Sequence, residues 1–113
     1  MIDTLAKELV MEFPTLSMDE AKVVALAYRM KDMKSMPLFV NQKPPPDGYF
    51  DSTMKVLHPE LPQHISVYCR ELVSKKFLCK HSSMPEMVRI ADELIPLCER
   101  ILNRSPYLGE NNI

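Results

Sequence analysis

Hydrophobic residues recur at steps of three and four along four parts of the chain, the spacing that places them on one face of an α-helix. The first part, from Ile2 to Phe13, ends at Pro14. In the second part the apolar positions cover more than one face, which predicts a central helix buried on two sides. The predicted helices span about 2–13, 17–35, 62–77 and 84–103.

Two helix starts carry the same polar signal. Ser17 is followed by Glu20, and Ser83 by Glu86, so both match the S-x-x-E capping box, in which each side chain satisfies a backbone N–H group of the other residue. Pro96 falls inside the last predicted helix, where its ring would clash with the carbonyl four residues earlier. We therefore expect that helix to be kinked or divided near Pro96.

Proline punctuates the chain while glycine is scarce, with ten prolines and two glycines. The run Pro44–Pro46 excludes helix and predicts a long Pro-rich loop at 36–50. Few glycines disfavour tight hairpin turns and phosphate-binding loops. The fold class expected is therefore all-α, a compact orthogonal or bundle-like domain over residues 1–106, followed by a loose tail at 107–113.

The composition and the net charge of the chain limit the classes of partner that it is expected to bind. The chain has 113 residues, is 46% hydrophobic and carries a formal net charge of −1. The balance gives no global electrostatic case for nucleic acid, so such binding would need a local patch. No stretch approaches the ~18 apolar residues of a membrane span, and the N-terminus lacks a secretory signal. We expect a cytoplasmic protein that does not bind membranes.

The cysteine and histidine residues could in principle form a metal site or supply a catalytic nucleophile. Cys69, Cys79 and Cys98 include no C-x-x-C pair, and Cys79-x-His81 is one tight pair without the second pair of a structural zinc site. No nucleophile motif surrounds these residues. We predict a non-enzymatic protein with no catalytic residue, no cofactor and no metal site.

Two sets of residues are candidates for binding. A basic cluster around the turn between the last two predicted helices could contact phosphate, although these cations could equally neutralise the C-terminal end of a helix. It consists of Arg70, Lys75, Lys76, Lys80 and Arg89. The other set, Met30, Met33 and Met36, could form an adaptable apolar surface for a partner or could fill the core.

The segment "VYCRELVSKKF" followed by a Ser-x-Pro-Glu helix start resembles small phage and prophage proteins related to the N-terminal domain of replicative-helicase loaders and inhibitors. The matching positions are Phe77, Ser83, Pro85 and Glu86, supported by hydrophobic Leu72, Val73, Val88 and Ile90. The resemblance implies an all-α domain with an accessory role in DNA replication. It assigns no site residue.

From these observations we predict a protein–protein interaction module whose partner is another protein, with a phage-derived replication role as the resemblance implies. A nucleic-acid-binding helical domain that uses the basic turn is the alternative. A small dimeric structural protein is a further alternative, because short helical chains often complete their core with a second subunit.

Overall fold

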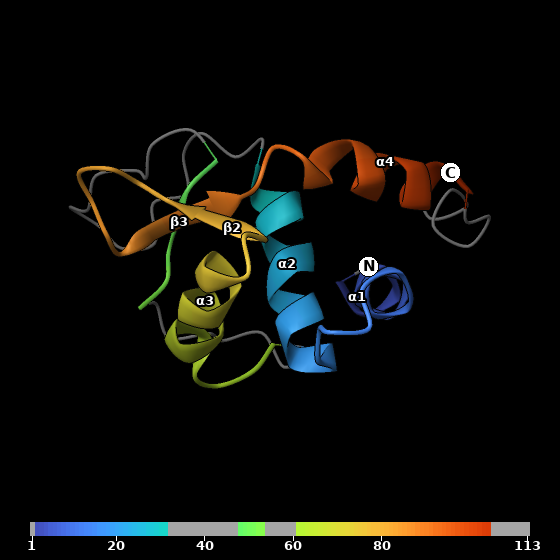
Figure 1. Cartoon of the computed structure of the whole chain (residues 1–113), viewed down its shortest axis with the longest axis horizontal. Coiled ribbons are helices and arrows are strands. Elements are labelled where there is room, and N and C mark those ends of the chain that lie inside the picture. Colours follow the sequence, from blue (N-terminus) through green and yellow to red (C-terminus); the bar gives the residue numbers. More distant parts are fainter. Residues whose placement is uncertain (1, 32–47, 54–60, 105–113) are drawn as a thin grey trace, which may run out of the picture.

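The computed structural model describes residues 2–31, 48–53 and 61–104 of the chain. Within these ranges four helices and three short strands follow one another (Figure 1). They are α1 (Ile2–Glu12), α2 (Met18–Met30), β1 (Phe50–Asp51), α3 (Ile65–Ser74), β2 (Leu78–Lys80), β3 (Met87–Ile90) and α4 (Leu94–Arg104). Most of the predicted Pro-rich loop at 36–50 and the predicted tail at 107–113 lie outside the described residues.

Helix α2 begins at the predicted capping box. The Ser17 hydroxyl accepts a hydrogen bond from the Glu20 N–H at 3.1 Å, and the Ser17 N–H donates to Glu20 Oε1 at 2.9 Å. Both bonds satisfy backbone donors that a helix start leaves without partners, so the box fixes where the helix begins. The helix ends at Met30 with Lys31 as its C-cap, and positions 32–35 of the predicted helix lie outside the described residues.

The fold is dominated by helices, as expected, but it is not purely all-α. It also contains a small antiparallel sheet, and strand β3 of that sheet lies in the first half of the predicted last helix. Its strand order is β1-β3-β2, with Lys80 and Phe50 both opposite Val88. Val88 and Ile90 are buried, whereas Met87 and Arg89 are half-buried. This two-residue alternation is the period of a strand with one face on the core, not that of a helix.

The second predicted capping box is also wrong. Ser83 and Glu86 lie in the loop between β2 and β3, and α4 begins only at Leu94. Pro96 therefore lies in the first turn of α4, where the backbone N–H groups have no partner inside the helix. At that position proline neither kinks nor divides the helix, contrary to the expectation.

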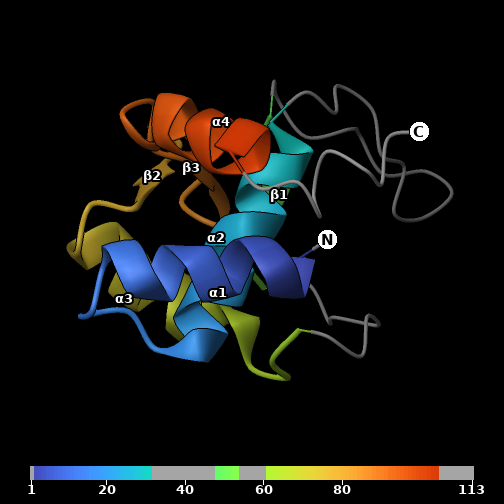
Figure 2. The ribbon, with the colours of Figure 1, turned by 90° about the vertical axis from the view of Figure 1, so that its right-hand side faces the viewer.

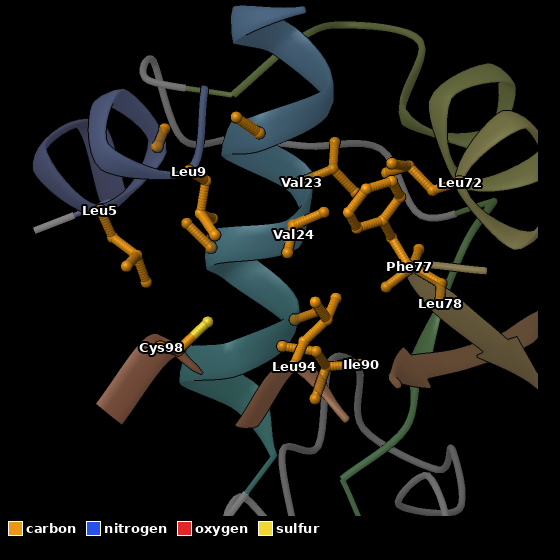
Figure 3. Close-up of a cluster of buried hydrophobic side chains, with 14 of the residues drawn as sticks. Leu5, Leu9, Val23, Val24, Leu72, Phe77, Leu78, Ile90, Leu94 and Cys98 are labelled. Atoms are coloured by element: carbon orange, nitrogen blue, oxygen red, sulfur yellow. The ribbon is translucent and has the colours of Figure 1, made fainter. Parts of the chain in front are cut away.

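A single hydrophobic core joins the helices to the sheet, and α2 runs through its centre (Figure 3). Helices α1 and α4 lie on one side of α2, and α3 with the β2–β3 hairpin lies on the other (Figures 1 and 2). Phe77 is buried in this core and packs edge-on against Phe13, with ring centroids 5.0 Å apart. None of the helices in the described ranges is long and apolar enough to cross a membrane.

Candidate functional site

Helix α3 has one buried face and one exposed face. The buried side chains are Ile65, Cys69 and Leu72. The exposed side chains, which we call the outer strip, are Val67, Arg70, Glu71 and Ser74. Steps of three, four and seven residues put all four on one face. Val67 is an apolar side chain that is nevertheless 58% exposed, so this face is open to a ligand.

The C-terminal end of α3 is closed by a Schellman motif. The Phe77 N–H donates to the Leu72 carbonyl at 2.9 Å, and the Lys76 N–H donates to the Val73 carbonyl at 3.1 Å. The motif requires a left-handed residue after the cap, and Lys76 takes that place with a φ of 70°. As a result, Phe77 turns into the core while the Lys76 side chain is exposed.

Lys75, one of the predicted phosphate contacts, forms an ion pair with a residue of another helix. Its Nζ lies 2.8 Å from Glu20 Oε2 and 3.1 Å from Glu20 Oε1, and it also donates to the Thr15 carbonyl at 3.3 Å. The Glu20 side chain is 8% exposed and that of Lys75 is 32% exposed. Lys75 thus joins the end of α3 to the start of α2, a role in the fold rather than in binding.

The surroundings of Glu20 shift its pKa. Burial of the carboxylate raises the pKa, but the hydrogen bonds from Lys75 and from the Ser17 N–H, together with the charge of Lys75, outweigh the burial. The net result is a pKa below the ordinary value of a glutamate. Glu20 is therefore held in its charged form, and the ion pair that locks α2 to α3 persists at neutral pH.

The loop of the β2–β3 hairpin is ordered by the ring of His81. His81 Nδ1 accepts hydrogen bonds from the N–H groups of Ser83 and Met84, at 3.0 and 3.2 Å. The backbone N–H of His81 donates to the Met87 carbonyl at 2.9 Å. These bonds hold the loop in a defined shape, and the exposed side chain of Lys80 lies at its edge, on the last residue of β2.

Arg89 is engaged on the outer face of the sheet. Its guanidinium lies 2.6 Å from Asp92 Oδ1 and 5.7 Å from the centroid of the Tyr49 ring. The His81 ring packs edge-on against the same tyrosine at 4.9 Å. Because a carboxylate already neutralises Arg89, we give it a smaller part in binding a phosphate than the cations of α3 and β2.

The structure therefore divides the predicted basic cluster. Arg70 on α3, Lys76 in the turn that follows it and Lys80 at the end of β2 are exposed, and we call these three residues the basic end. Val67, Glu71 and Ser74 were missed as site residues, although they alternate with the apolar stripe at helical spacing and could have been found that way.

The structure describes one of the three methionines predicted to form a partner surface, Met30, and that residue is buried. Met30 is 4% exposed and belongs to the core, because α2 is buried on both sides and a residue on its last turn still faces other elements. Met33 and Met36 lie outside the described residues. Core filling, the other interpretation of these methionines, is correct for Met30.

The three thiols differ in their surroundings. Cys69 and Cys98 are buried, and desolvation raises the pKa of each to about 12, whereas Cys79 is exposed on β2. Across residues 2–31, 48–53 and 61–104, no three histidine, cysteine, aspartate or glutamate side chains are grouped so that they could hold a metal ion.

Comparison with known proteins adds no relative: no family model matches the chain, and neither a curated protein nor a solved structure resembles it significantly.

Proposed function

We propose that this chain is a nucleic-acid-binding domain whose contact surface is the outer strip of α3 together with the β2–β3 hairpin. The observation that carries the proposal is the basic end, three exposed cations on a helix, on the turn after it and on the strand that follows. Residues 61–92, which contain these elements, include five basic and three acidic residues in a chain with a net charge of −1. Two of the five, Lys75 and Arg89, are paired with Glu20 and Asp92, so the exposed positive charge of this region is that of Arg70, Lys76 and Lys80.

The geometry of α3 supports phosphate binding in a second way. The first turn of the helix holds no acidic residue, so its N-terminal end keeps the partial positive charge of the helix dipole. Exposed Gln63 and His64 precede this end and can donate hydrogen bonds to phosphate. Cations therefore lie toward one end of α3, and backbone dipoles point outward at the other.

A protein partner is the second candidate, favoured by two exposed apolar side chains on the same elements. Val67 on α3 is 58% exposed and Met84 in the hairpin loop is 39% exposed. Residues of this kind anchor protein interfaces when they cluster. The replication role implied by the resemblance to helicase loaders fits either candidate and stays a prediction.

Fluorescence anisotropy with labelled mixed-sequence DNA and RNA tests the proposal. The site variant Arg70→Gln/Lys76→Gly/Lys80→Gln removes the three cations, and glycine at position 76 accepts the left-handed conformation. The matched control is Lys7→Gln/Arg29→Gln/Arg100→Gln, which removes three exposed cations from α1, α2 and α4. Both variants change the net charge by the same amount, so only the location differs.

We expect the site variant to lose about tenfold or more in affinity at low salt, and the control variant to lose about threefold at most. Wild-type affinity should fall steeply as salt rises, because binding releases counterions from the phosphates. Equal losses in the two variants, or affinity that does not respond to salt, would show that the basic end is not the contact surface.

A further inference from the structure

The dimensions of α3 match one groove of nucleic acid. Its ten residues make a helix about 15 Å long, and a helix with its side chains is about 10–12 Å across. The major groove of B-form DNA is about 12 Å wide and about 8.5 Å deep, so it admits such a helix. The outer strip from Val67 to Ser74 would face the floor of the groove over two helical turns.

The side chains of the outer strip have the chemistry that distinguishes base pairs. Arginine can donate two hydrogen bonds to guanine, glutamate can accept one from cytosine, serine can donate or accept, and an apolar side chain contacts the methyl group of thymine. Arg70, Glu71, Ser74 and Val67 supply these four types. A surface that bound phosphate alone would have no use for an exposed glutamate and valine at its centre.

Other nucleic acids fit the same surface less well. Single strands are bound by stacking bases on exposed aromatic rings, and every aromatic residue in the described ranges is buried or half-buried. On α3 itself the Tyr68 hydroxyl donates a hydrogen bond to Asp19 Oδ2 at 3.1 Å, and Phe77, three residues past the end of α3, lies in the core. Duplex RNA has a deep, narrow major groove that a helix cannot enter.

We infer that the ligand is duplex DNA, with α3 in the major groove, Arg70 reading a base edge, and Lys76 and Lys80 on the flanking phosphates. The inference rests on the proposed function and adds to it the class of nucleic acid and a separate role for each cation. Lys76 lies in the turn between α3 and β2, and Lys80 ends β2, so Arg70 is the one of the three cations that lies on the helix face.

Selection from a pool of randomised duplex DNA, followed by sequencing of the bound fraction, tests the inference. The pool is applied to the wild type, to Arg70→Gln and to Lys80→Gln, which each remove one exposed cation. The best duplex is then compared with either of its single strands and with an RNA duplex of the same sequence. Circular dichroism melting of both variants verifies that they fold.

We expect the DNA duplex to bind about tenfold or more tightly than the single strands or the RNA duplex. Arg70→Gln should reduce discrimination at one base position by about tenfold, while Lys80→Gln should weaken all sequences alike. Equal or tighter binding of single strands or RNA overturns the inference and leaves the proposed function intact, as does a uniform loss in Arg70→Gln. Failure to bind any of the probes overturns both.

Discussion

Replacing Lys75 by methionine should destabilise the fold, because it leaves the Glu20 carboxylate charged and without its cation. The carboxylate is 8% exposed and would keep the hydrogen bonds of the capping box but lose Lys75 at 2.8 Å. Removing one partner of a fully buried ion pair costs about 3–5 kcal/mol. Because the Lys75 side chain is 32% exposed and solvent screens the pair, we expect a smaller loss, about 2 kcal/mol.

The partner variant Glu20→Gln should cost less, about 1 kcal/mol. Its amide oxygen can still accept from the Ser17 N–H, and the partly exposed Lys75 can turn toward water. The double variant Glu20→Gln/Lys75→Met contains neither charge. If the two residues stabilise each other, its loss should be smaller than the sum of the single losses by about 1 kcal/mol.

The same pair makes stability depend on pH. The pKa of Glu20 is lowered in the folded protein, so the pair contributes its full stabilisation above the ordinary glutamate pKa of 4.5, and this is lost as pH falls through the folded value. Urea unfolding followed by circular dichroism at pH 7 and at about pH 3 measures the effect. The Glu20→Gln variant should lose less stability on acidification than the wild type.

Two results would refute this reasoning. One is a Lys75→Met variant that unfolds at the same urea concentration as the wild type. The other is a double variant whose loss equals the sum of the single losses, which would mean that Lys75 and Glu20 do not act on each other.

Two further predictions concern other parts of the same region. Lys76→Gly should stabilise the fold by about 0.5–1 kcal/mol, because a lysine with φ of 70° is strained where glycine is not, and Lys76→Ala should give no such gain in urea unfolding. A destabilised glycine variant would contradict this. Exposed Cys79 should react fast with a thiol reagent in the native protein, whereas Cys69 and Cys98, with a pKa of about 12, should react only after unfolding. Three fast thiols in the native state would contradict the burial of Cys69 and Cys98.

The helices with long apolar periods could be predicted from the sequence, whereas the sheet could not. Val88 and Ile90 alternate at two-residue steps over only four positions, and Val88 also fits a helical stripe continued by Ala91 and Leu94. The apolar positions of a short strand next to a helix can therefore be mistaken for an extension of that helix. Strand β1 has two residues, too few for any pattern, and is defined by its pairing with Val88 and Met87 of β3.

The sequence was enough to predict which basic residues surround the candidate site. It was not enough to predict which of them are paired inside the fold and which are exposed. Lys75 differs from Lys76 and Lys80 in its contacts with Glu20 and Thr15, which lie 55 and 60 residues away in the sequence. The sequence pattern carries no signal for a contact at that distance. Met30, by contrast, could have been assigned to the core, because the apolar positions of its helix already indicated burial on two sides.

The salt dependence of DNA binding, measured for the wild type and two variants, tests most directly whether the basic end contacts phosphate. For Lys80→Gln the negative slope of log K against log salt should become shallower by about 0.9, the value for one lost phosphate contact. For the charge-neutral double variant Glu20→Gln/Lys75→Met it should equal that of the wild type. An unchanged slope in Lys80→Gln, or a reduced slope in the double variant, would contradict the division of roles between Lys80 and Lys75.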